Sequence, residues 1–167
     1  MNDGRVLYLD SPLGTIELRG KNGFLTDLNF REKPPGFQEA KIPVLEGWAA
    51  QLAEYFAGAR TTFEIPLALE GTVFQAEVWE ALRTVSFGRT ASYVEIARKI
   101  GRPSAVRAVG AANGANPVSI IVPCHRIVGA DGSLTGYGGG LWRKKWLLEH
   151  EKRNSGKPDA PFESPII

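Results

Sequence analysis

The amino-acid sequence predicts a mixed α/β fold: a small N-terminal α/β domain with an antiparallel sheet, then a mostly helical C-terminal domain that contains a helix-turn-helix. Short apolar alternations separated by turn signals fill residues 1–70. Two short helical segments joined by a Gly-Arg-Pro-Ser turn follow around residue 101. With 167 residues, 43% of them hydrophobic, the chain is long enough to bury the cores of two small domains.

The N-terminal domain, residues 1–70, begins with strands. Alternating apolar residues predict three of them, over residues 6–9, 15–18 and 24–30. The Asn22-Gly23 pair predicts a tight hairpin turn. Apolar residues at helical spacing predict a helix over 44–56, which Gly58 ends, and a further strand is expected over 62–69. No chemistry is visible in this domain, so we interpret it as a support.

The C-terminal domain, residues 71–153, begins with helix signals. Thr72 is placed to cap a helix that contains Trp79, which we interpret as a core residue rather than as a platform for base stacking. Ser92 is placed to cap the next helix. The helix-turn-helix is expected over a helix at 93–100, a turn at 101–104 and a helix at 105–113.

The second helix of this pair is poor in bulky side chains. Ala108, Gly110, Ala111 and Ala112 give it a face that can approach another surface closely. That surface is either the core of the protein or DNA, with Arg107 as the one long cationic side chain of the helix. The helix by itself leaves both interpretations open.

The chain beyond this helix carries the remaining signals. Asn116-Pro117 ends helical structure, because a residue before proline is pushed out of the α region. Three segments follow: an apolar run over 118–122 that leads to Cys124, a glycine-rich loop over 136–140 and a charged helix over 141–152. Residues 154–167 are rich in Pro, Ser and Gly, and we expect them to form a flexible tail.

Composition excludes several classes of protein. No run approaches the roughly 20 apolar residues of a membrane span, and the first residues do not form a basic leader, so we expect a cytoplasmic protein without membrane contact. A net charge of +2 is compatible with a polyanionic partner but does not identify one. One cysteine and two histidines cannot build a four-ligand zinc site of the Cys/His kind, and we expect no metal.

The single cysteine, Cys124, is either an inert core residue or a nucleophile. A free thiol has a pKa of about 8.5, so a nucleophile at neutral pH needs a base nearby. His125 is the obvious base, although neighbouring side chains diverge and a bridging water would be needed. Glu151 is a candidate to orient the imidazole, or else a solvated charge, and His150 is expected at the surface.

The run Pro123-Cys124-His125-Arg126-Ile127-Val128-Gly129 resembles the active-site signature of the O6-methylguanine-DNA methyltransferase family. Further matches occur in the same order: Phe74 to Trp79, Ser92-Tyr93, Arg107 to Gly110, Asn116-Pro117, and Gly136-Tyr137 before a Leu-Leu-Glu-His-Glu helix. The resemblance is strong over residues 72–151 and loose over the N-terminal third, which is ribonuclease-H-like in the family.

The resemblance implies repair of DNA by direct reversal of damage. The protein would flip O6-methylguanine, or another O6-alkylguanine, out of duplex DNA and transfer the alkyl group irreversibly and stoichiometrically to Cys124. His125 would be the water-relayed base and Glu151 the residue that orients it. Tyr93 would hydrogen-bond the flipped guanine, and Asn116 would tie the recognition helix to the active-site strand.

The resemblance also implies which residues contact the substrate. Arg107 would enter the base stack from a helix in the minor groove, unlike the usual major-groove docking of the motif. The other expected DNA contacts are Ser92, Ala108, Gly110 and Arg126. The guanine pocket is expected to be lined by Ser119, Ile127, Tyr137, Gly138 and Gly139. No cofactor is expected, because the damaged DNA is itself the alkyl donor, and we expect a monomer.

Three other functions remain open. A non-catalytic module that binds alkylguanine DNA would keep the DNA-binding surface but lack the cysteine, whereas Cys124 is present. A hydrolase built on Cys124 and His125 would turn over an ester or amide repeatedly. A transcription regulator would bind undamaged DNA in a sequence-specific way.

Overall fold

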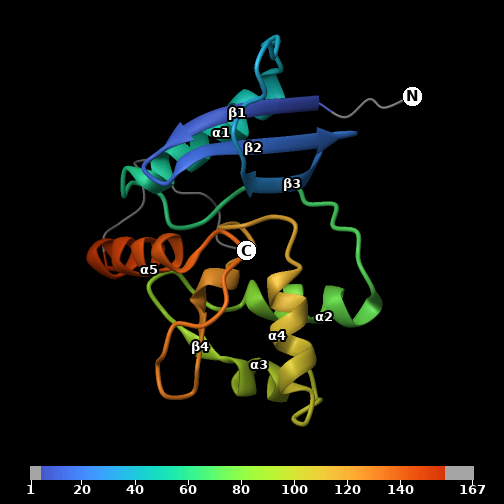
Figure 1. The fold of residues 1–167 in the computed structure, drawn as a ribbon, viewed down its shortest axis with the longest axis vertical. Coiled ribbons are helices and arrows are strands. Elements are labelled where there is room, and N and C mark those ends of the chain that lie inside the picture. The colour runs from blue at the N-terminus through green and yellow to red at the C-terminus, as the bar shows by residue number, and fades with distance from the viewer. Residues whose placement is uncertain (1–4, 157–167) are drawn as a thin grey trace. The chain divides into compact units, whose positions relative to one another are not determined.

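The computed structural model describes residues 5–156, and the chain divides into two compact units, one that ends at Leu69 and one that spans Glu70–Ser155 (Figure 1). The segment expected as a tail begins at Asn154, which is the last residue of a helix, and residues 157–167 lie outside the described residues. Within residues 5–156, no helix has both the length and the apolar composition needed to cross a membrane.

The first unit is built on a three-stranded sheet. Strands β1 (Arg5–Ser11), β2 (Gly14–Lys21) and β3 (Phe24–Phe30) are antiparallel, in the order β1-β2-β3 (Figure 1). The turn between β2 and β3 has Asn22 at φ 52° and Gly23 at φ 81°. Asparagine and glycine tolerate this left-handed backbone better than other residues, and the predicted two-residue hairpin is confirmed.

Helix α1 (Pro43–Phe56) packs against β1 and β2 and completes the core of this unit. Leu45, Leu52 and Tyr55 of the helix have no exposed surface, and neither do Ile16 and Leu18 of β2. The helix ends just before Gly58, which has φ 80°, as the sequence predicted.

The strand expected over residues 62–69 is wrong. Only Leu67 pairs with the sheet, through an isolated parallel bridge to Leu25. Leu25 donates its N–H to Pro66 O at 2.8 Å, and Ala68 donates to Leu25 O at 3.0 Å. The ladder stops there because Pro66 has no N–H to donate.

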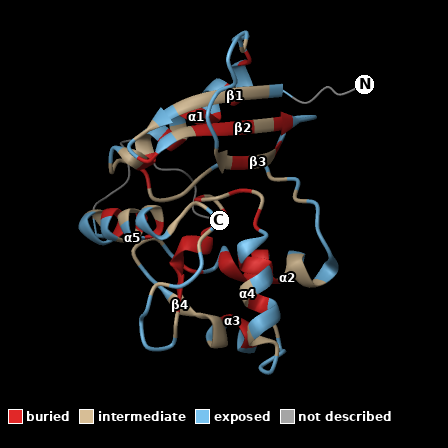
Figure 2. Cartoon of the chain, in the orientation of Figure 1, coloured by how far each residue is buried: buried red, intermediate tan, exposed pale blue. Residues whose placement is uncertain are grey.

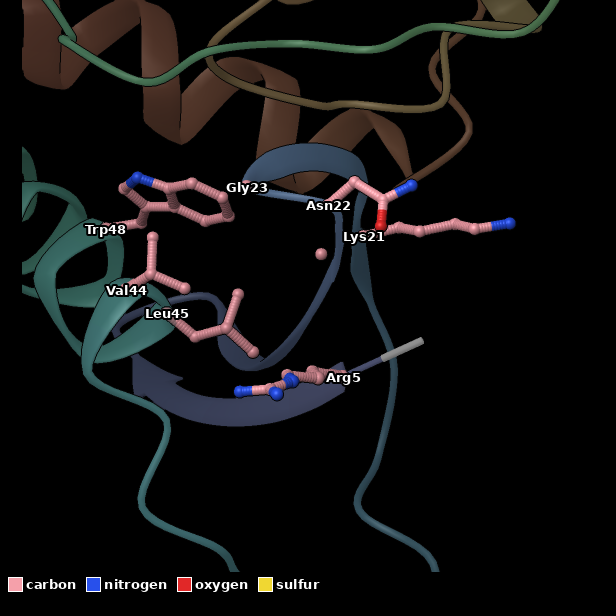
Figure 3. A pocket seen from close by; sticks show the side chains of 8 residues that line it. Arg5, Lys21, Asn22, Gly23, Val44, Leu45 and Trp48 are labelled. Atoms are coloured by element: carbon pink, nitrogen blue, oxygen red, sulfur yellow. The ribbon is translucent and has the colours of Figure 1, made fainter. Parts of the chain in front are cut away.

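A pocket of about 210 Å³ lies on this unit, beside the first turns of α1 (Figure 3). Arg5 and Lys21 supply cationic groups to its wall, and Val44 and Trp48 supply apolar ones. None of the residues that line it is a cysteine, a histidine or a carboxylate. The pocket therefore offers neither a nucleophile nor an acid–base pair.

The second unit contains the predicted helix-turn-helix. Its first three helices are α2 (Val73–Leu82), α3 (Tyr93–Lys99) and α4 (Val106–Gly114), which pack against one another. Thr72 and Ser92 each form a capping box, with Gln75 and Glu95, so both predicted helix starts are confirmed. Trp79 is 2% exposed and donates its indole N–H to Ala112 O at 2.8 Å, which confirms it as a core residue.

The remaining elements of this unit bring distant segments together. They are β4 (Ala91–Ser92), the 3-10 helix η1 (Cys124–Arg126), β5 (Ile127–Val128) and α5 (Leu141–Asn154). Strand β4 pairs with β5 in parallel. Because the two strands are parallel, the start of α3 lies beside the loop that follows β5, and η1 lies beside the residues that precede β4. Figure 2 shows η1 as buried.

Candidate active site

The segment that precedes Cys124 is a turn and not a strand. Residues 118–122, which the family resemblance led us to expect as a strand, form turns, and Ile120 has φ 72°, a conformation that is strained for a β-branched residue. Asn116 organises this segment: its amide donates to Val122 O at 2.8 Å, and its carbonyl oxygen accepts from Val118 N at 3.0 Å. Cys124 N also donates to Val122 O, at 2.8 Å.

Cys124 is buried, with 6% of the residue exposed. Burial raises its pKa, while the Asn116 amide and the charge of Lys144 act in the opposite direction. The burial effect is the larger one, so the resting group is a thiol rather than a thiolate. A reaction of this sulfur therefore needs a base.

His125 is fully buried and well placed to serve as that base. Its Nε2 lies 2.7 Å from Glu151 Oε2, and its Nδ1 has no hydrogen-bond partner among the described residues. Burial lowers the pKa of His125, and the Glu151 carboxylate only partly opposes this effect. A neutral ring that donates Nε2–H to Glu151 keeps a lone pair on Nδ1, which is the arrangement a proton acceptor requires.

Glu151 is 1% exposed, and its carboxylate accepts several hydrogen bonds. Besides His125, its carboxylate accepts from Arg126 Nε at 2.8 Å, from Arg126 Nη2 at 3.1 Å and from Gly88 N at 3.3 Å. Burial would raise the pKa of Glu151, but His125 and Arg126 outweigh it and hold the pKa well below its ordinary value. The solvated-charge interpretation of Glu151 is therefore wrong.

Tyr93 and the loop after β5 form one side of the site. The Tyr93 hydroxyl donates to Thr135 O and accepts from Thr135 Oγ1, both at 3.2 Å. A Cβ on Gly110 would lie 3.9 Å from the Tyr93 ring, so α4 and α3 approach closely there. The Tyr137 hydroxyl is buried without a partner among the described residues, beside Ser119, and burial raises its pKa.

Arg107 and Ala108 are exposed on α4, whereas Val109, Ala112 and Asn113 are buried on the opposite face (Figure 2). The two interpretations of this helix are therefore compatible. One face packs in the core, and the other leaves small side chains and one arginine free for a partner. Gly110 lies at the edge between the two faces and is partly buried.

Comparison with known proteins decides the family. Residues 73–153 match the model of the 6-O-methylguanine DNA methyltransferase DNA binding domain, and residues 5–69 match that of its ribonuclease-like domain. The methylated-DNA–protein-cysteine methyltransferase of Mycolicibacterium paratuberculosis is 49% identical over 88% of this chain and 92% of its own. The chain belongs to the 6-O-methylguanine DNA methyltransferase family.

Solved structures of this family resemble the whole chain. Mycobacterium tuberculosis OGT, crystallised in complex with DNA, is 50% identical, covers 90% of this chain and 94% of its own, and superposes with a TM-score of 0.80. An O6-methylguanine DNA methyltransferase from Methanococcus jannaschii is 26% identical, covers 98% of this chain and 99% of its own, and has a TM-score of 0.64. The predicted fold class is confirmed by these likenesses.

Two residues that we expected at the surface of this methyltransferase are buried, so these predictions are wrong. Arg126, expected on the DNA surface, is 7% exposed, because its guanidinium is bound to Glu151 and to Val85 O. His150, expected at the surface, is 3% exposed, and its ring stacks on Trp146 with centroids 4.8 Å apart.

The sequence also failed to indicate Lys144. This lysine has no exposed surface, and its Nζ donates to Ile127 O at 2.5 Å and to Thr135 O at 2.8 Å. It thereby joins β5 to the loop that meets Tyr93. Its spacing of seven residues from Glu151 puts both on one face of α5, and this periodicity was the available signal.

Asn113 is a second residue that was missed. Its side-chain amide donates to Cys124 O at 3.4 Å, and its carbonyl oxygen is buried with no partner in the part of the chain that the structure describes. In the described part of this family member, three such unpartnered buried atoms gather around Cys124: Asn113 Oδ1, His125 Nδ1 and Tyr137 Oη. Buried polar atoms are normally paired, so these three atoms have hydrogen-bonding capacity available for water or for a ligand.

The residues expected in the guanine pocket differ in burial and in hydrogen bonding. Ile127 is buried and accepts from Lys144, Gly139 O accepts from Arg143 Nη1 at 2.7 Å, and Gly138 is exposed. Ser92 is half-buried, and its hydroxyl is engaged in capping α3.

Proposed function

We propose that this protein repairs O6-alkylguanine in duplex DNA by transferring the alkyl group to Cys124, and that each molecule reacts once. One observation carries the proposal: the only cysteine of the chain precedes a buried histidine that is bonded to Glu151 at 2.7 Å and whose second nitrogen has no partner among residues 5–156. The names of the relatives, and the DNA bound to Mycobacterium tuberculosis OGT, support the same reaction and the same partner.

The first step generates the nucleophile. Nδ1 of His125 takes the proton of the Cys124 thiol through a bridging water molecule, while Glu151 holds the ring in the required orientation. The burial of all three residues supports this step, because burial keeps the thiol protonated and the imidazole neutral at rest.

The second step moves the alkyl group. The sulfur attacks the alkyl carbon, an S–C bond forms, and the bond between that carbon and guanine O6 breaks. The released electron pair stays on the guanine, which finally receives the proton that left the thiol. The product is a thioether, which has no easy hydrolytic exit, so one molecule repairs one lesion. The damaged DNA supplies the alkyl group, and no cofactor takes part.

Tyr93 is the group we assign to the departing base. Its hydroxyl hydrogen-bonds the flipped guanine and helps to neutralise it as a leaving group. The close approach of Tyr93 to Thr135 supports this assignment, because the same loop carries Tyr137. We assign the wall of the guanine pocket to five residues: Ser119, Ile127, Tyr137, Gly138 and Gly139.

Extrusion of the base is assigned to α4. Arg107 enters the base stack in place of the flipped nucleotide, with α4 in the minor groove and Ala108, Gly110 and Ser92 against the DNA. The exposed, unbulky face of α4 supports this role. Asn116 acts as the hinge between α4 and the turn that carries Cys124, in line with its hydrogen bonds to Val122 and Val118.

We assign these steps to residues 71–153 and a supporting role to residues 1–70. A cytoplasmic location fits the reaction, because an acceptor thiol must stay reduced until it meets the lesion. The protein acts as a monomer in this scheme.

Replacing Cys124 by Ser tests the proposal. A hydroxyl is a far poorer nucleophile at neutral pH, so C124S should bind duplex DNA with one O6-methylguanine as the parent does but should transfer no methyl group. Binding is measured by fluorescence anisotropy and transfer by loss of the lesion from the oligonucleotide. Methyl transfer at the parental rate in C124S would contradict the proposal.

A further inference from the structure

Arg126 occupies the centre of the buried network rather than the surface. Its Nε and Nη2 donate to the two oxygens of Glu151 at 2.8 and 3.1 Å, and its Nη1 donates to Val85 O at 2.6 Å. The guanidinium also lies 5.9 Å from the centre of the Phe87 ring. These contacts come from α5 and from the loop between α2 and β4, so the guanidinium is held from two sides.

Glu151 therefore has two candidates for its counterion. Arg126 grips both carboxylate oxygens in a bidentate pair and is always charged. His125 donates to one oxygen only, at 2.7 Å, and that bond needs a proton on Nε2 alone. With the guanidinium in place, the carboxylate is neutralised without a second proton on the imidazole.

We propose that Arg126 is a positioning residue that keeps His125 neutral: it neutralises Glu151, so the imidazole holds a proton only on Nε2 and presents Nδ1 as a free base. This inference rests on the proposed function, in which His125 accepts the proton of Cys124. It gives a mechanistic role to an arginine that the sequence pattern had suggested for DNA contact.

The charges around His125 agree with this assignment. From α5, Glu151 and Lys144 face it, and from η1 its neighbours are Arg126 and the uncharged thiol of Cys124. Two cations thus oppose one carboxylate. Burial lowers the pKa of His125, Arg126 and Lys144 lower it further, and Glu151 acts in the opposite direction. Without Arg126, the buried carboxylate would favour a doubly protonated ring.

The test is an NMR titration of the histidine rings in the protein without DNA. The chain has two histidines, so His150, which stacks on Trp146, serves as the internal reference. In the parent protein, His125 should be neutral at pH 7 with its proton on Nε2. In Arg126→Met, the midpoint of the His125 titration should rise by about one unit or more, whereas that of His150 should stay in place.

The double variant Arg126→Met, Glu151→Gln serves as the matched control, because it removes both charges. If Arg126 acts through Glu151, the His125 midpoint should return to the parental value in the double variant. An unchanged midpoint in Arg126→Met, or a raised midpoint that persists in the double variant, would overturn the inference.

If Arg126→Met does not fold, the protonation state of His125 in the parent protein still tests the inference. A doubly protonated His125 at pH 7 in the parent would refute it. Because the titration uses no DNA, that result would leave alkyl transfer to Cys124 standing. Conversely, failure of the parent to transfer a methyl group would refute the proposed function, whatever the His125 titration shows.

Discussion

The reactivity of Cys124 depends on groups that lie far from it in the sequence. The identity of the nucleophile and of its neighbour His125 followed from local sequence and the family signature. The positions of Glu151, Lys144 and Asn113 depend on how α5 and α4 pack against η1. The local sequence pattern shows which face of a helix a residue occupies. It does not show which element packs against that face, and for this reason Lys144 was missed.

We predict that the charge of Lys144 affects the reactivity of Cys124. Its ammonium is buried, bonded to two carbonyl groups, and lowers the pKa of the Cys124 thiol. Lys144→Met removes this charge, so the pH midpoint for reaction of Cys124 with a small alkylating reagent should move upwards by about one unit. Lys145→Met, at the exposed neighbouring position, is the control and should leave the midpoint in place. Equal midpoints in the parent and Lys144→Met would show that the charge does not act on the thiol.

Arg126 and His150 show the opposite failure of sequence reasoning. The family resemblance led us to expect Arg126 at the DNA surface, whereas its bidentate pair with Glu151 makes a buried position tolerable. Glu151 lies 25 residues further along the chain, so its carboxylate reaches Arg126 only when the protein is folded.

At the scale of elements, local signals predicted well wherever the backbone chemistry was local. The Asn22-Gly23 hairpin and the capping residues Thr72 and Ser92 fulfil their predicted roles through contacts within a few residues. The segments at 62–69 and 118–122 were apolar enough for strands. Pro66 breaks the ladder of the first, and tertiary contacts made by Asn116 hold the second as a turn.

The role of α4 in base extrusion can be tested through Arg107. Arg107→Ala should slow repair of duplex DNA by about tenfold or more, because flipping costs a few kcal/mol and only the duplex reaction needs it. Reaction with a free O6-methylguanine base should change by less than about twofold. Arg153→Ala, at the exposed end of α5, controls for the loss of one positive charge. Equal losses with both substrates would exclude the role assigned to Arg107.

At the scale of the whole molecule, the buried network makes stability depend on pH. The pKa of Glu151 lies below its ordinary value of 4.5, so its stabilising effect is complete above pH 4.5 and is lost as the pH falls through the lower, folded-state value. The pKa of His125 lies below 6.5, so the unfolded chain binds more protons below that pH and gains stability relative to the folded one. Both effects weaken the fold in acid.

The free energy of unfolding should therefore be nearly constant between about pH 7 and pH 8 and fall steadily below about pH 6.5. Urea unfolding followed by tryptophan fluorescence measures this dependence. The slope below pH 4.5 should be shallower in Glu151→Gln, which cannot titrate there. A parent protein whose unfolding free energy is the same at pH 7 and pH 4 would contradict the charge states described for the network.

Intact-mass spectrometry shows whether each molecule transfers one alkyl group to Cys124. The protein is mixed with an excess of duplex DNA that contains one O6-methylguanine, and the modified residue is mapped by peptide fragmentation. We expect a gain of one methyl group, located on Cys124, with no further gain on longer incubation. An unchanged mass despite lesion binding, or repeated turnover without a modified cysteine, would contradict it.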